Sequence, residues 1–63
     1  MNLRRIRTTK GFSLRELAEL SGVGFVTIAR IEAGTLDPRL STLQKLSKAL
    51  RVSLTELVQR GRK

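Results

Sequence analysis

Three short segments constrain the fold of this 63-residue chain more than any other feature. They read SLRE from Ser13, STLQ from Ser41 and SLTE from Ser53. In such a capping box, the serine hydroxyl accepts a hydrogen bond from the backbone amide three residues later. The Glu or Gln side chain in turn accepts one from the amide of the serine. We therefore expect helices to begin directly after these three serines.

Glycines mark the places where helices end. Gly11, Gly22 and Gly34 each follow a segment with helical spacing, and glycine readily takes the left-handed backbone conformation that closes a helix. The chain shows no strand-like alternation of apolar and polar residues. The sequence therefore predicts an all-α fold in one domain over residues 1–63. Its five helices are expected at residues 2–10, 14–21, 25–33, 41–50 and 54–60.

Apolar residues recur three and four positions apart along these helices, as a helix that buries one face requires. The predicted core contains Leu3, Ile6, Leu17, Ala18, Ile28, Ile31, Leu43, Leu46, Leu50, Leu54, Leu57 and Val58. Four further residues lie at the junctions between helices and are expected to plug the ends of the core: Phe12, Val23, Leu40 and Val52. The chain has no cysteine, so packing and capping must stabilise it without disulfides.

The charge of the chain points to a polyanionic partner. Thirteen Lys and Arg residues against five Asp and Glu residues give a formal net charge of +8. Such an excess favours nucleic acid or an acidic membrane surface, and the alternative is a solvated surface that is merely basic. The chain contains no apolar run near the roughly 20 residues of a membrane span, and its start, MNLRRIR, lacks the apolar stretch of a signal peptide. We expect a cytoplasmic protein without a membrane partner.

Catalysis and cofactor binding find no support in the residue types. Cysteine and histidine are absent, and the five acidic residues are spread over separate segments. Neither a nucleophile with its base, nor a metal-ligand cluster, nor a glycine-rich phosphate loop is recognisable. We expect no enzymatic activity, no metal, no cofactor and no small-molecule ligand.

The helices predicted at residues 14–21 and 25–33 are joined only by Gly22, Val23 and Gly24, so the second helix must turn sharply against the first. A tight glycine-containing turn between two short helices is the helix-turn-helix arrangement, whose second helix enters the major groove of DNA.

A helical wheel with about 100° per residue separates the faces of the second helix. With Ile28 and Ile31 turned inward, the outward face carries Val26, Arg30 and Ala33. Phe25 lies about a quarter turn from the core. The wheel leaves open whether Phe25 packs against the preceding helix or faces outward.

The stretch FSLRELAELSGVGFVTIARIEAGTLDPRLSTLQKLSKALRVSLTEL resembles the Cro/repressor, or Xre-type, family of helix-turn-helix domains known from lambdoid phage repressors. The similarity runs from about Leu3 to Val58, and its most specific parts are LAELSGV, TIARIEAG, DPRLSTLQKLSKAL and VSLTEL. The resemblance implies a five-helix fold whose third helix reads double-stranded DNA. It implies a sequence-specific transcriptional regulator, most simply a repressor that binds a near-palindromic operator as a homodimer.

The resemblance also assigns roles to residues. The positions that read base edges correspond to Phe25, Val26 and Arg30. Those near phosphates or supporting the contact are Leu14, Arg15, Thr27, Ala29, Ala33, Thr35 and Arg39. A structural ion pair of some family members corresponds to Arg7 and Glu32. The dimer contact corresponds to Arg39, Leu40, Thr42, Leu54, Leu57 and Val58.

Three departures from the family pattern affect the reading surface. Leu14 replaces a common glutamine, Gly24 replaces a serine or threonine cap, and Phe25 with Val26 replaces a polar pair. Apolar side chains suit the methyl group of thymine, and an arginine fork suits guanine. Two alternatives stay open: a protein-interaction module or antitoxin whose apolar face, Leu14 with Phe25 and Val26, docks on a protein, and a charge-driven nucleic-acid coat without sequence preference.

Overall fold

Five helices follow one another in the computed structural model, which describes residues 1–58. They are α1 (Leu3–Thr9), α2 (Leu14–Ser21), α3 (Phe25–Ala33), α4 (Leu40–Leu50) and α5 (Leu54–Val58). The described part of the chain contains no strand. The prediction of an all-α, five-helix fold is thus confirmed. The predicted end of the last helix, at residue 60, lies outside the described residues.

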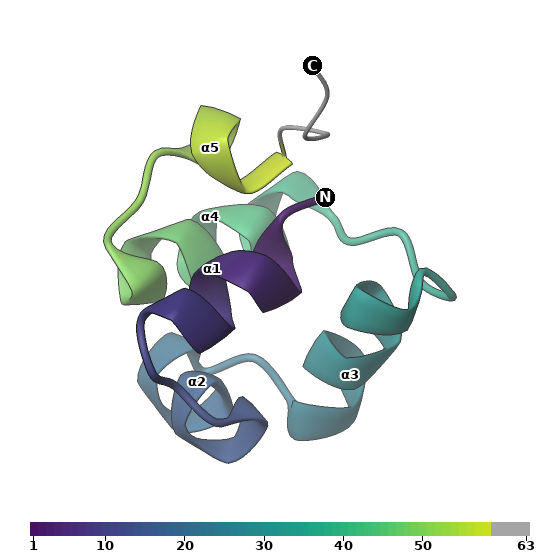
Figure 1. The fold of residues 1–63 in the computed structure, drawn as a ribbon. Coiled ribbons are helices and arrows are strands. Elements are labelled where there is room, and N and C mark those ends of the chain that lie inside the picture. Colours follow the sequence, from purple (N-terminus) through teal and green to yellow (C-terminus); the bar gives the residue numbers. More distant parts are fainter. Residues whose placement is uncertain (59–63) are drawn as a thin grey trace.

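The helices form a bundle in which α4 packs against α2 and α5, while α1 packs against α3 and α5. Figure 1 shows α2 and α5 at opposite ends of the molecule and α3 along one side. The backbone amide of Asn2 donates to the Leu57 carbonyl at 3.0 Å. Its side-chain amide donates to the Glu56 carbonyl at 3.2 Å. These bonds tie the start of the chain to α5.

The core is contributed by all five helices and by the turn between α2 and α3. Its buried residues are Leu3, Leu17, Val23, Ile28, Ile31, Leu46, Leu50 and Leu57. The partly buried residues packed against them are Ile6, Phe12, Leu14, Ala18, Leu43, Ala49 and Val52. Because each fully buried aliphatic side chain contributes about 1.5–3 kcal/mol, this cluster is the main source of stability.

Three predicted core residues do not belong to the core cluster: Leu54 is half-buried outside it, and Leu40 and Val58 are exposed. Leu40 is 59% exposed and Val58 is 39% exposed. Leu40 is the first residue of α4 and lies about one turn before Leu43, which packs on the core. Its side chain therefore lies past the end of the core. Val58 is rotated by about 100° from the buried Leu57. The prediction that Leu40 plugs a junction is therefore wrong.

Two of the three predicted capping boxes are present. The amide of Glu16 donates to Ser13 Oγ at 3.0 Å, and the amide of Ser13 donates to Glu16 Oε1 at 2.9 Å. The second box joins Ser53 and Glu56 in the same way, at 3.0 and 3.2 Å.

The third prediction, a cap at Ser41, is wrong. Helix α4 begins at Leu40, and its N-cap is Arg39, which has an extended backbone and makes no side-chain cap bond. The Leu43 amide bonds to the Arg39 carbonyl at 3.0 Å. Ser41 thus lies inside the first turn, past the position from which a hydroxyl can cap the helix.

This difference between two serines predicts a measurable contrast. Replacing Ser13 with alanine is expected to lower the free energy of unfolding by about 1 kcal/mol, because the Glu16 amide loses its acceptor, Ser13 Oγ. Urea denaturation followed by circular dichroism measures the change. Ser41→Ala is the matched control and should change stability by less than about 0.5 kcal/mol. Equal effects of both substitutions would contradict the assigned caps.

Candidate nucleic-acid interface

The turn between α2 and α3 fixes the angle at which α3 leaves α2. Gly22 has a left-handed backbone with φ of 75°, and its amide donates to the Ala18 carbonyl at 2.9 Å. Val23 is buried, and its amide donates to Ser21 Oγ at 3.1 Å. Gly24 then caps α3, because the Ile28 amide donates to its carbonyl at 3.0 Å. The predicted sharp turn is present, and the buried Val23 anchors it to the core.

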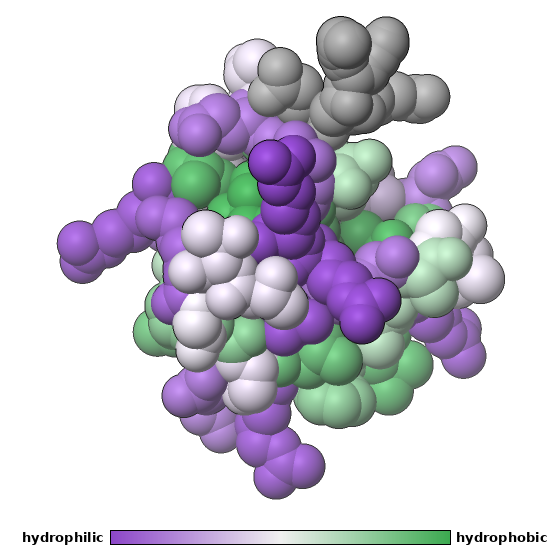
Figure 2. Space-filling view, in the orientation of Figure 1, coloured by the Kyte–Doolittle hydropathy of each residue, from purple (hydrophilic) through white to green (hydrophobic). Residues whose placement is uncertain are grey.

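Helix α3 presents one face to the core and the other to solvent. Ile28 and Ile31 are buried, whereas Val26 is 59% and Phe25 46% exposed. Phe25 does not belong to the residues packed on the core, so the structure places it at the surface. Figure 2 shows hydrophobic surface around the start of α3, which is its lower end in the view shared with Figure 1.

The remaining predicted residues of α3 fall where the helical wheel expected them. Arg30 and Ala33 are exposed, and Thr27 and Ala29 are half-buried on the flanks. Among residues 1–58, no hydrogen bond or ion pair involves the Arg30 guanidinium. The exposed Thr35 closes the helix instead, since its amide and its hydroxyl donate to the Arg30 carbonyl at 3.0 and 3.3 Å. The outward face of α3 thus combines an apolar start with one available cation a turn later.

The structure places Arg7 against Glu32. Arg7 Nε lies 2.7 Å from Glu32 Oε2, and Nη2 lies 3.1 Å from Oε1. The third guanidinium nitrogen donates to the Phe12 carbonyl at 2.8 Å. Only 11% and 8% of the two side chains are exposed. The hydrogen bond to Glu32 raises the pKa of Arg7 above its ordinary value, and desolvation opposes the rise. One side chain thereby joins α1, α3 and the loop before α2.

Three of the residues predicted to support DNA contact lie at the starts of α2 and α4. Leu14 and Arg15 form the first turn of α2, and Arg39 caps α4. Arg15 and Arg39 are exposed, whereas Leu14 is half-buried and packs against the core. The Leu14 side chain therefore stabilises the fold, and only its backbone amide, which lacks an intrahelical partner in the first turn, remains for a ligand.

The residues assigned to the dimer contact differ in their exposure. Arg39 and Leu40 are exposed, Val58 is partly exposed, and Thr42 and Leu54 are half-buried. Leu57 is completely buried in the core. Its assignment to a partner contact is corrected, because the side chain cannot reach a second molecule while it packs inside this one.

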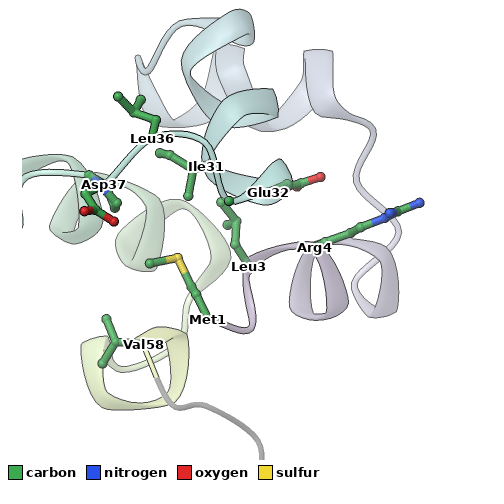
Figure 3. Close-up of a pocket in the computed structure, with 10 residues that line it drawn as sticks. Met1, Leu3, Arg4, Ile31, Glu32, Leu36, Asp37 and Val58 are labelled. Carbon is green, nitrogen blue, oxygen red and sulfur yellow. The ribbon is translucent and has the colours of Figure 1, made fainter.

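A hollow of about 540 Å³ lies between the start of the chain, the segment after α3 and α5. Met1, Leu3 and Ile31 lie around its centre with Leu36 and Val58 nearby, while the Arg4 and Glu32 side chains point away (Figure 3). Met1 and Leu36, which are 47% and 38% exposed, are not distinguished by any sequence pattern. No helical period marks residues at a chain start or in a loop, so only the fold brings them beside Val58.

Two kinds of structural feature are absent from the described part of the chain. No helix there is long and apolar enough to cross a membrane. Residues 1–58 also contain no group of three or more metal-ligating side chains.

Comparisons with known proteins agree with this geometry. A family model described as "Helix-turn-helix" matches residues 3–57. The chain is 46% identical over 54 residues to the HTH-type transcriptional regulator PuuR of Escherichia coli, covering 86% of this chain and 29% of PuuR. It is 38% identical over 56 residues to the cryptic phage CTXphi transcriptional repressor RstR of Vibrio cholerae, covering 89% of this chain and 50% of RstR.

A solved structure matches over almost the whole chain. The N-terminal DNA binding domain of SinR from Bacillus subtilis superposes with a TM-score of 0.89 at 33% identity, covering 98% of this chain and 91% of that domain. The chain spans under a third of the length of PuuR. The match over residues 3–57 and the shared fold establish that the chain belongs to the Cro/repressor-type helix-turn-helix family, a family of non-enzymatic DNA-binding transcriptional regulators.

Proposed function

We propose that this chain binds double-stranded DNA with sequence preference and regulates transcription, most simply as a repressor, with α3 in the major groove. The observation that carries the proposal is the two-sided character of α3. Ile28 and Ile31 hold one side in the core, while Phe25, Val26 and Arg30 stand free on the other. A helix held rigidly by one face and exposed on the other is suited to enter a groove.

Positive charge at two helix starts supports the same orientation. Arg15 lies in the first turn of α2, and Arg39 caps α4. Helix starts direct free amides and a partial positive charge outward, and both favour phosphate oxygens. We propose that Arg15, Arg39 and the amides beside them hold the DNA backbone, with Thr27, Ala29, Ala33 and Thr35 alongside. Such contacts set the register of α3 on the duplex.

The side chains on α3 suggest what is read. An apolar side chain in the major groove can contact the C5-methyl group of thymine, and an arginine fork matches the two acceptors of guanine. We propose that Val26, assisted by Phe25, contacts thymine methyl groups. Arg30 then bonds to guanine or to a phosphate.

This assignment predicts the outcome of a selection experiment. In vitro selection of bound duplexes should show that the unaltered protein prefers thymine. Val26→Ser should weaken this preference for thymine over other bases by about tenfold or less, at a single position of each half-site. Serine is small and polar, so the methyl contact is lost while the exposed position stays compatible with the fold. An unchanged preference at every position would contradict the assignment of Val26.

We propose further that the protein binds its operator as a homodimer. Exposed apolar residues support this: Leu36 and Val58 line the hollow between α5 and the segment after α3, and Leu40 is exposed at the start of α4. The selected duplexes test it directly. Two half-sites in inverted orientation are expected, about one helical turn apart.

One observation favours a second candidate function. Phe25 and Val26 form an apolar surface that a protein partner could also cover, as in an interaction module or an antitoxin. Competition distinguishes the two, because an excess of nonspecific DNA and high salt should leave a protein contact of this kind largely intact, whereas both should displace a DNA ligand.

A further inference from the structure

We propose that the start of α3 recognises the C5-methyl group of a pyrimidine by shape alone, so that 5-methylcytosine can take the place of thymine. Methylation of cytosine would then create or strengthen binding sites for this protein. The inference rests on the proposed function, because it requires α3 to lie in the major groove.

The start of α3 presents no polar side-chain atom at its most exposed positions. Val26 is 59% and Phe25 46% exposed, and neither side chain can donate or accept a hydrogen bond. The polar groups close to them are engaged or set back. Ser21 Oγ already accepts from the Val23 amide at 3.1 Å. The half-buried Thr27 holds its hydroxyl toward Gly24, 3.5 Å from the position that a Cβ on that glycine would take.

The next polar side chain on this face is Arg30, one helical turn after Val26. The guanidinium of Arg30 is a donor without acceptor capacity. It can donate to a purine, to a phosphate or to O4 of a thymine, and we assign it to a guanine or a phosphate. With Arg30 engaged there, position 4 of the pyrimidine beside Val26 is left unread by side chains of this helix.

Chemistry then decides which bases fit. Thymine and 5-methylcytosine carry the same methyl group at C5 and differ at position 4, where thymine has an acceptor and cytosine a donor. An apolar side chain leaves both groups without a partner, so it discriminates little between them. It does discriminate the methyl group from its absence, because uracil and unmethylated cytosine leave apolar surface of Val26 in contact with water. From the free energy of burying one methyl group, the expected difference is about fourfold in affinity per contact.

Four versions of one duplex test the proposal. The duplex is taken from in vitro selection with this protein, and the versions differ at the pyrimidine whose preference depends on Val26. That position carries thymine, deoxyuridine, 5-methylcytosine or cytosine, each opposite its pairing purine. The expected affinities for thymine and 5-methylcytosine agree within about twofold, and those for deoxyuridine and cytosine are about fourfold weaker.

Two variants show which side chain is responsible for the effect of the C5-methyl group on affinity. Val26→Ala should reduce the effect of the methyl group to less than about twofold, because alanine does not reach it. Leu20→Ala is the matched control. Leu20 is also 59% exposed but lies in α2 beside a different hollow, lined by Lys10, Phe12 and Ala49. It should retain the full methyl effect, and circular dichroism of both variants verifies that they are folded.

Each other outcome has a definite meaning. Equal affinity for thymine and deoxyuridine, in a protein that still prefers the selected duplex to a scrambled one, would overturn the inference and leave the proposed function standing. Tight binding of thymine with 5-methylcytosine as weak as cytosine would also overturn it, since position 4 or the paired purine would then be read. If the selected and scrambled duplexes bind alike, the proposed function fails and the inference fails with it.

Discussion

Replacing Glu32 with alanine is expected to lower the free energy of unfolding by about 3 kcal/mol, because a buried guanidinium loses its counter-charge. Arg7 would lose partners at 2.7 and 3.1 Å while only 11% of its side chain is exposed. A single core in a chain of 63 residues supplies only about 3–5 kcal/mol. The melting temperature should therefore fall by roughly 10 °C or more, as measured by circular dichroism.

The pKa of Arg7 determines at which pH this effect is seen. The hydrogen bond to Glu32 raises the pKa of Arg7 above its ordinary value. A raised pKa in the folded state contributes stability that is fully present below the unfolded value and is lost only as pH rises through the folded value. Arg7 is charged throughout the neutral range, so Glu32→Ala should be destabilising at every pH from mildly acidic to mildly basic.

Two controls separate the stranded charge from a simple loss of contacts. Glu19 is exposed on α2 and has no hydrogen bond or ion pair among residues 1–58, so Glu19→Ala should change stability by less than about 0.5 kcal/mol. The double variant Arg7→Leu with Glu32→Leu removes both charges and should be clearly more stable than Glu32→Ala. A melting temperature of Glu32→Ala equal to that of the unaltered protein would show that the pair does not stabilise the fold.

Raising the monovalent salt concentration from about 50 to 200 mM is expected to weaken binding to a selected duplex about a thousandfold. The reason is that each neutralised phosphate releases counterions, and about six such contacts per dimer give a slope of log affinity against log salt near −5. A net charge of +8 and the exposed Arg15 and Arg39 at helix starts lead us to this number of contacts. Fluorescence anisotropy with a labelled duplex measures the slope.

Single neutralisations identify the cations that contribute. Arg15→Gln and Arg39→Gln should each make the slope shallower by about one for each copy of the chain on the duplex. Lys10→Gln is the matched control, since Lys10 is exposed at the end of α1, beside Leu20 and Arg51, and should leave the slope nearly unchanged. A slope near zero for the unaltered protein would exclude DNA as the ligand and favour a protein partner.

Local features of the chain were predictable because they depend on neighbouring residues. The boxes at Ser13 and Ser53 were correctly predicted, since a capping serine bonds to an amide only three residues away. Ser41 shows the limit of the same pattern. Arg39, which follows Pro38, has an extended backbone and is the N-cap of α4. The helix therefore begins at Leu40, before Ser41. The end of α4 shows a second limit. Arg51 takes a left-handed backbone with φ of 58°, where the sequence offers no glycine to mark it.

In the candidate site, too, local features were predictable and features that depend on neighbouring helices were not. The outward direction of Val26 followed from the helical period once Ile28 and Ile31 were taken as buried, because one period governs the whole helix. The exposure of Phe25 could not be derived in this way, since a residue at the margin of the apolar face is buried or exposed according to what the neighbouring helix covers. The sequence assigned Leu57 both to the core and to the dimer contact, and the contacts of α5 with α4 and α1 decide for the core.

The sequence by itself determined five helices, the glycines that follow three of them, most of the core and the apolar start of α3, because backbone hydrogen bonding and side-chain period act over a few residues. The tertiary structure alone decided how those parts meet. Arg7 and Glu32 lie 25 residues apart along the chain, and the Phe12 carbonyl that completes their contact belongs to a loop. Met1, Leu36 and Val58 gather around one hollow from three distant segments. Such contacts depend on the packing of whole helices, which no local pattern specifies.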